Sequence, residues 1–196
     1  ARRRKAHKRK FALAAGLIVV TLAVIAWYFA YYTQRPEYAL MQAAVALEEH
    51  DLEAFERRVN VAAVAEAGYD DLTYVLFARD TSLNESERNA SGKFYEKIRG
   101  SVTEGLARTI EGAVRTGAWA EPDGADALKG RQLGIDFEYL MECSHLRDTS
   151  LVQIGEVVRD GGGAVATLTV LDGGTGLEFP LQLRMEQTET GWQVVR

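Results

Sequence analysis

The residues from Phe11 to Tyr32 form a run of 22 residues without a charged side chain. As an α-helix this run would be about 33 Å long, and the hydrocarbon core of a bilayer is about 30 Å thick. A stretch of this length and composition predicts a transmembrane helix over residues 11–32. A buried core helix is the less favoured interpretation, because a strongly basic segment directly precedes the run.

Residues 1–10 contain seven Lys and Arg side chains. Positive residues beside a membrane span stay on the cytoplasmic side, and each adds about 1 kcal/mol of attraction to anionic lipids. We therefore expect residues 1–10 to be a cytoplasmic tail that contacts lipids, and the chain from Thr33 onward to lie outside the cytoplasm. A nucleic-acid-binding arm is the alternative interpretation. The seven cations are Arg2, Arg3, Arg4, Lys5, Lys8, Arg9 and Lys10.

Aromatic residues crowd the far end of the apolar run, where amphipathic rings favour the headgroup level of a bilayer. A cleaved signal peptide is the main alternative to an anchor, with Val24 and Ala26 as its small-residue cleavage signal. An uncleaved anchor is favoured, because the run exceeds the usual signal length and cleavage would expose aromatic residues at the new terminus. These residues are Trp27, Tyr28, Phe29, Tyr31 and Tyr32.

The charge of the remaining chain limits its partners. The whole chain carries a net charge of −5, so removing the seven positive charges of the tail leaves −12 for residues 11–196. Such an acidic chain is a poor candidate for nucleic-acid binding, and no nucleic-acid partner is expected. The single cysteine, Cys143, cannot form an internal disulfide, so an apolar core must hold the domain together. Residues 33–196 are long enough for one domain.

Helices are predicted over about residues 37–118, where apolar residues recur at spacings of three and four. Asp51 and Asn60 are placed to cap the second and third of these helices, and Gly68 is expected to end the third. The polar residues 79–92 are predicted to form a loop.

Apolar residues then recur every four positions from Phe94 to Val114. Such a stripe rotates by about 40° per step around a helix, so one flat neighbour cannot cover it. We expect one long helix that is buried from two sides and ends at Gly117. A bend within the segment is the alternative.

Strands are predicted over about residues 150–196. Residues 177–186 alternate strictly between apolar and polar, which is typical of a half-buried strand, and Pro180 requires a sheet edge or a bulge. Glycine-rich segments between the strands fit hairpin turns. The domain is therefore expected to be α+β, with helices packed on a curved antiparallel sheet. Positions expected to face the core are Phe55, Leu177, Phe179, Leu181, Leu183, Met185 and Trp192.

The start of the outer domain resembles an uncharacterised bacterial domain family that has one N-terminal membrane anchor. Residues 35–40 read RPEYAL, and Asp51, Phe55 and Val59 keep the family's spacing, although Asn60 stands where the family usually has Asp. The closing residues 191–195, GWQVV, are similar to the end of cone-shaped domains related to nuclear transport factor two. The resemblance implies a cone-like α+β fold outside the membrane and no known reaction.

The residue types that support catalysis or metal binding do not fall at useful spacings. His50, His145 and Cys143 lack the spacing of a ligand pair, and the glycine runs lack the lysine of a phosphate-binding loop. The pair Asp70-Asp71 is expected to be surface charge or a helix cap. No catalytic residue, metal or cofactor is therefore predicted. The fold analogy alone suggests a cavity near Asp136, Tyr139 and Trp192.

The sequence favours a single-pass cell-membrane protein whose extracytoplasmic domain binds a partner or an envelope component. Its expected partners are membrane lipids, through residues 1–32, and a protein of unknown identity. A small-molecule-binding or hydrolytic cone-type domain is one alternative. A tethered accessory subunit of a membrane complex is the other.

Overall fold

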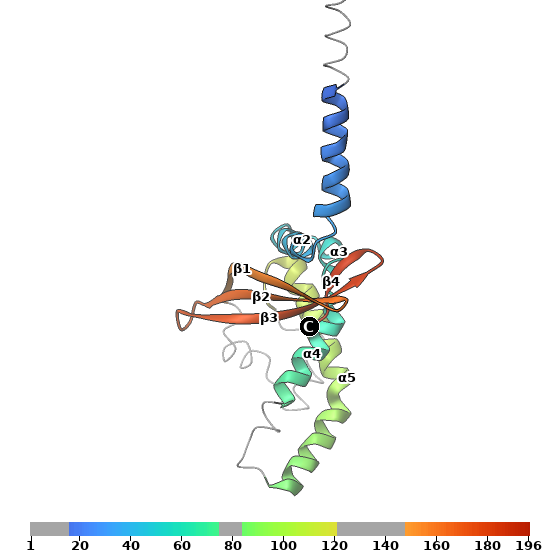
Figure 1. Cartoon of the computed structure of the whole chain (residues 1–196). Coiled ribbons are helices and arrows are strands. Elements are labelled where there is room, and N and C mark those ends of the chain that lie inside the picture. Colours follow the sequence, from blue (N-terminus) through green and yellow to red (C-terminus); the bar gives the residue numbers. More distant parts are fainter. Residues whose placement is uncertain (1–15, 75–83, 121–147) are drawn as a thin grey trace, which may run out of the picture.

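The chain forms a series of helices followed by an antiparallel sheet, which confirms the predicted α+β class (Figure 1). The structure is a computed structural model that describes residues 16–74, 84–120 and 148–196. The helices are an N-terminal helix (Gly16–Tyr32), whose last five residues form the π-helix η1 (Tyr28–Tyr32), then α2 (Pro36–Glu48), α3 (Leu52–Glu56), α4 (Val61–Thr73) and α5 (Glu85–Thr116). The strands are β1 (Thr149–Asp160), β2 (Gly163–Asp172), β3 (Leu177–Thr188) and β4 (Gly191–Val194).

Short polar side chains begin the helices where the sequence predicted them. The Asp51 carboxylate accepts a hydrogen bond from the backbone N–H of Ala54, and the Asn60 side chain accepts one from the N–H of Ala63. Both predicted N-caps are confirmed. The predicted end of α4 at Gly68 is wrong, because the helix continues to Thr73. Gly68 keeps ordinary helical geometry there, and the next residue, Tyr69, is buried and so holds the following turn in place.

A single long helix, α5, confirms that the four-residue stripe lies on one helix. The expectation that the whole stripe is buried from two sides is wrong, because Phe94 and Leu106 are 44% and 37% exposed. It starts earlier than predicted: Asn84 and Glu87 form a capping box, with reciprocal hydrogen bonds of 2.9 Å between side chain and backbone. The predicted loop is therefore wrong over residues 85–92, because a capping box can start a helix whose first turns are entirely polar. The helix ends at Gly117, as predicted, where φ is +71°.

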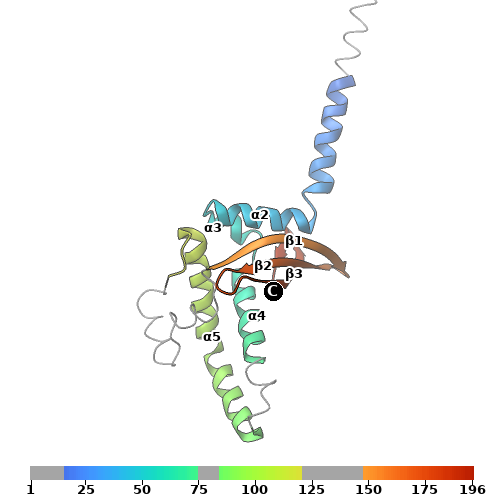
Figure 2. The ribbon, with the colours of Figure 1, turned by 90° about the vertical axis from the view of Figure 1, so that its left-hand side faces the viewer.

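The sheet is a meander in the order β1-β2-β3-β4, with every pair antiparallel. β4 pairs with residues 185–188 of β3, so among the described residues no strand pairs with the outer side of the earlier part of β3, which includes Pro180. The predicted edge position of this proline is confirmed. β1 follows an arc in Figure 2, and two register shifts in its pairing with β2 are local sources of such bending.

The core lies where α2 meets the end of the sheet that carries β4. Trp192 is 5% exposed, which confirms its predicted burial, whereas Phe55 is only half-buried against the core. Met185 is fully buried and Leu183 half-buried. The buried cluster consists of Ala39, Leu40, Ala43, Val59, Val61, Ala164, Ala166, Met185, Trp192 and Val194.

The first half of β3 does not have the predicted burial. Leu177, Phe179 and Leu181 share a face with Met185 but are 44% to 57% exposed. The expectation that the whole apolar row faces the core is wrong, because the buried cluster draws its β3 contacts from the half next to β4.

Candidate functional site

The N-terminal helix projects away from the rest of the molecule (Figure 1). Its large apolar side chains from Leu17 to Tyr31 are 40% to 70% exposed, and none of residues 16–31 is buried. Folding of the domain therefore leaves this apolar surface without a partner among the described residues. Exposed apolar surface of this extent marks a site of interaction with protein or lipid.

Tyrosine and tryptophan rings form an aromatic collar at the domain end of this helix, which we define as Trp27, Tyr28, Tyr31, Tyr32 and Tyr38. The rings of Trp27 and Tyr31 stack with centroids 5.6 Å apart, and those of Tyr28 and Tyr32 stack at 5.3 Å. Tyr32 also meets the Tyr38 ring of α2 edge to face at 5.5 Å. The collar therefore continues from the N-terminal helix onto α2.

Arg35 caps the collar on the domain side. Its guanidinium donates a hydrogen bond of 2.7 Å to the Tyr31 hydroxyl and lies 4.6 Å from the centre of the same ring. An arginine over an aromatic face gains a cation–π attraction, and the contact keeps the charge at the edge of the apolar region. The backbone of Arg35 is extended, as expected for the residue before a proline.

The connection between the N-terminal helix and the domain is held by the last strand. The indole Nε1–H of Trp192 donates a hydrogen bond of 2.9 Å to the backbone carbonyl of Gln34. The Arg159 guanidinium lies 5.7 Å from the same indole ring. At this connection the chain turns by 88° into α2. Trp192 therefore ties the sheet to the turn that sets the direction of the N-terminal helix.

Among the described residues, no helix taken alone has the length and apolar composition to cross a membrane, whereas the N-terminal helix and α2, bent at 88°, meet that test as a pair. The basic tail, from Arg2 to Lys10, lies outside the described residues.

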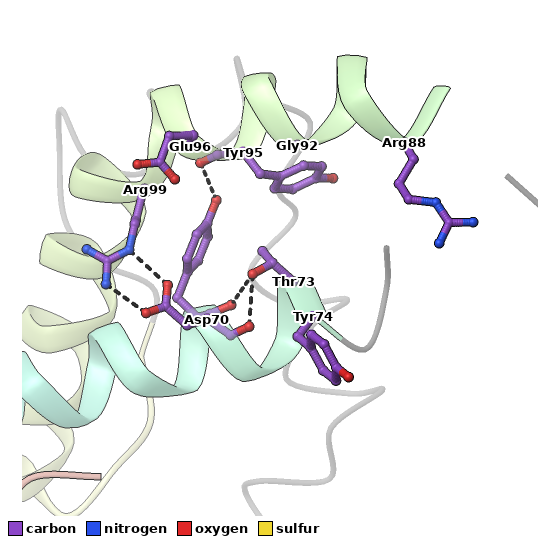
Figure 3. A pocket seen from close by; sticks show the side chains of 9 residues that line it. Asp70, Thr73, Tyr74, Arg88, Gly92, Tyr95, Glu96 and Arg99 are labelled. Carbon is purple, nitrogen blue, oxygen red and sulfur yellow. Dashed lines mark hydrogen bonds and ion pairs between the residues drawn. The ribbon is translucent and has the colours of Figure 1, made fainter. Parts of the chain in front are cut away.

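A second feature is an open polar cleft of about 320 Å³ between the end of α4 and the start of α5 (Figure 3). Three tyrosines and two arginines give it an aromatic and charged lining. Its lining residues are Tyr69, Asp70, Thr73, Tyr74, Arg88, Gly92, Tyr95, Glu96 and Arg99.

Arg99 crosses one end of the cleft and ties α5 to α4. Its Nε donates to Asp70 Oδ1 at 2.8 Å and its terminal nitrogen donates to Asp70 Oδ2 at 2.9 Å, while Glu66 accepts a further bond at 3.1 Å. The guanidinium holds the pKa of the Asp70 carboxyl below its ordinary value, and the two carboxylates raise the pKa of Arg99. Both groups are therefore charged at neutral pH.

Tyr69 makes a second contact between α4 and α5 at the cleft. Its hydroxyl donates a hydrogen bond of 2.7 Å to the backbone carbonyl of Tyr95, and burial raises its pKa. The phenol is therefore neutral and fixed as a donor at physiological pH. Neither Tyr69 nor Asp70 is arranged as a general base, because the first keeps its proton and the second has a lowered pKa with both oxygens bound by Arg99. The cleft is suited to binding by aromatic and charged contacts.

The acidic pair of α4 lies on the surface, and both carboxylates form ion pairs instead of capping a helix. Asp70 is bound to Arg99, and Asp71 forms an ion pair with Arg196 at the end of the chain. Within residues 16–74, 84–120 and 148–196, no group of three or more His, Cys, Asp or Glu side chains is placed to hold a metal ion. Cys143 and His145 lie outside these ranges.

The three residues of the suggested cavity are not tested as a group. Asp136 and Tyr139 lie outside the described residues, and Trp192 contributes to the core and to the connection at Gln34 instead of lining the polar cleft. The polar cleft itself was not anticipated from the sequence. Glu66 and Asp70 stand four residues apart on α4, a spacing that can present two carboxylates to one cation.

Comparison of the chain with protein-family models, with curated proteins and with solved structures finds no match.

Proposed function

We propose that this chain is a single-pass cell-membrane protein whose α+β domain lies outside the cytoplasm and binds a partner. The observation that carries the proposal is the exposure of the apolar N-terminal helix, in which none of residues 16–31 is buried against the domain. Transfer of apolar surface out of water gains about 25 cal/mol per Å², so a helix of this composition favours a lipid environment. The uncharged run of the sequence begins at Phe11, and its 22 residues are enough for a helix that crosses a bilayer.

The orientation follows from the two ends of the helix. Seven cations precede it, and positive flanks stay in the cytoplasm. The aromatic collar lies at the opposite end, where rings are suited to the outer headgroup layer. In this orientation the acidic domain is outside the cytoplasm and the basic tail contacts the anionic inner leaflet.

Binding is favoured over hydrolysis for the outer domain. The polar cleft offers exposed aromatic and charged side chains, with Tyr74 62% exposed, but its Asp70 and Tyr69 are occupied in contacts that hold α4 to α5. A cone-like fold related to nuclear transport factor two is part of this proposal and is supported by the resemblance of residues 35–60 and 191–195 together with the α+β class.

Two reporters fused after Arg196 test the orientation, one active only inside the cytoplasm and one active only outside it. The outside reporter is expected to be active and the inside reporter silent. The matched control replaces the seven cations of the tail with Gln, which is expected to lower the outside signal and raise the inside signal. An active inside reporter on the unmodified chain would contradict the proposed orientation.

The binding role is tested with a photo-crosslinking residue placed at Tyr74 of the full chain in native membranes. A discrete crosslinked species is expected at this position and not at Gln182, an exposed control position on β3. Equal labelling at both positions would show that the cleft has no specific partner.

A further inference from the structure

The helix α2 has a second apolar stripe on the side opposite the core. Its buried residues, Ala39, Leu40, Ala43 and Ala46, occupy one face. At about 100° per residue, Met41 falls about 175° from the centre of that face, Val45 about 145° and Tyr38 about 125°. Met41 and Val45 are 43% and 42% exposed. A surface helix normally keeps polar residues on its outward side, so this stripe requires an explanation.

The position of α2 indicates what covers this stripe. Figures 1 and 2 show α2 at the end of the domain nearest the N-terminal helix, with the sheet on its other side. The two helices meet at 88°. If the N-terminal helix stands across a bilayer, α2 lies along the membrane plane and its outward stripe faces the lipid surface.

The stripe is also continuous with the aromatic collar. Tyr38, the first residue of the stripe, contacts the Tyr32 ring at 5.5 Å. Collar and stripe therefore form one surface that turns the corner from the N-terminal helix onto α2. An apolar helix face beside a membrane span is the arrangement of an interfacial helix, which buries its apolar side about 5–10 Å into the headgroup boundary.

We infer that α2 is an interfacial helix whose Tyr38, Met41 and Val45 insert into the outer headgroup layer of the membrane that holds the N-terminal helix. The inference rests on the proposed function, because it requires the apolar helix to span that membrane. The partner of the α2 stripe is therefore a lipid surface.

The charges around the stripe define the kind of lipid surface. Glu37 and Glu48 share the outward side of α2 next to Met41, and Gln42 lies beyond Tyr38 on the other side of the stripe. No cation of α2 lies on this face, so anionic lipids provide no attraction. The contact is apolar and suits a zwitterionic surface, and it is expected to be insensitive to salt.

The contact would fix the direction in which the domain faces. With α2 flat on the membrane, the start of α5 is, among the described residues of the domain, the part farthest from the N-terminal helix (Figures 1 and 2). The polar cleft, lined by Arg88, Gly92 and Tyr95 of that segment, then opens into the aqueous phase away from the lipid. A partner that binds the cleft would therefore bind at a distance from the membrane surface.

The test uses the full chain carrying Cys143→Ser in phosphatidylcholine nanodiscs, with single nitroxide labels at Leu22→Cys, Met41→Cys, Val45→Cys or Lys93→Cys. Collision rates with oxygen and with a nickel chelate report the depth of each label. All four positions are exposed, so the labels leave the core intact. Leu22 is expected deep in the hydrocarbon, Met41 and Val45 at headgroup depth, and Lys93 in water.

The label at Leu22 distinguishes a failure of the membrane anchor from a failure of the interfacial helix. A deep Leu22 together with nickel-accessible labels at both Met41 and Val45 would overturn the interfacial helix and leave the membrane anchor intact. A nickel-accessible Leu22 would overturn the proposed function and this inference together. Strong spin–spin coupling between Met41 labels of two chains would assign the stripe to a second copy of the protein, which also overturns the inference.

Discussion

Trp192 combines two stabilising roles in one side chain. Its ring is buried in the core, and its Nε1–H satisfies the carbonyl of Gln34 at the turn before α2. Trp192→Phe would keep most of the buried ring and lose the hydrogen bond, with an expected cost of about 0.5–1.5 kcal/mol. Trp192→Ala is expected to cost about 3–5 kcal/mol, because it also leaves a cavity. Denaturant unfolding of the full chain in detergent measures both, and equal costs for Phe and Ala would contradict this division.

Asp70 gives the domain a defined sensitivity to acid. Arg99 lowers the pKa of the folded Asp70 carboxyl below its ordinary value of 3.8, so the unfolded chain takes up the proton first as the pH falls. The stabilisation is therefore complete above the unfolded pKa and is lost as the pH falls through the folded one. Asp70→Asn is expected to be less stable than the wild type at neutral pH, and this difference should shrink as the pH falls below the unfolded pKa.

Unfolding curves at about pH 7 and about pH 3 check this expectation. Glu178→Gln removes an exposed carboxylate from the surface of β3 and serves as the control for lost negative charge. The neutral-pH loss should stay well below that of a core truncation, since the Asp70 side chain is 55% exposed. An equal deficit at both pH values would show that Asp70 acts through its shape instead of its charge.

At the scale of elements, the end of α5 is fixed by a contact with the turn after α2. The His50 Nδ1 lies 3.1 Å from the carbonyl oxygen of Val114, and the ring covers Gly117. A Cβ on Gly117 would lie 2.5 Å from the imidazole Cε1, and its φ of +71° disfavours any L side chain. Gly117→Ala is therefore expected to cost about 1–2 kcal/mol from the backbone and about 1 kcal/mol from the displaced His50 contact.

A double-mutant cycle separates these two costs. In the His50→Ala background, Gly117→Ala should cost only the backbone term of about 1–2 kcal/mol. Thermal or denaturant unfolding of the four variants gives the coupling energy. Full additivity would mean that the ring and the glycine do not depend on each other, contrary to their contact in the structure.

The elements show which parts of the fold local sequence can predict. Asp51 and Asn60 were identifiable as caps because a cap acts on an N–H within three residues. The start of α5 could have been predicted in the same way from the capping box of Asn84 and Glu87, but the polar composition of its first turns favoured a loop. The alternation in β3 predicted the strand and its edge proline. Alternation gives one face of a strand and does not show how far the helices extend over it, so the exposure of Phe179 could not be predicted.

The candidate sites depend on contacts that sequence patterns do not contain. The ion pair between Asp70 and Arg99 joins residues 29 positions apart, and the hydrogen bond from Trp192 to Gln34 spans 158 positions. Tyr38 and Met41 lie on the expected helix, yet their outward direction is known only once the sheet has selected the opposite face as core. The anchor, in contrast, depends on composition alone and needs no tertiary contact to be proposed.

At the scale of the whole molecule, the proposed anchor separates two parts of opposite charge, a tail of seven cations and a remainder of net charge −12. The N-terminal helix contributes no buried residue over positions 16–31, so folding of the domain does not require its apolar side chains. Substitutions in the middle of that helix are therefore expected to change membrane insertion without changing the stability of the domain.

Leu22 stands at the middle of the 22-residue uncharged run. An arginine at the centre of a membrane span costs about 2.5–3.5 kcal/mol on insertion, so Val19→Arg with Leu22→Arg is expected to release most of the chain from the membrane. Alkaline carbonate extraction measures the retained fraction, and Val45→Arg is the matched control, because an arginine at headgroup depth reaches water. The control should remain in the membrane fraction like the wild type. Retention of the double variant at the wild-type level would mean that the apolar helix is not the anchor.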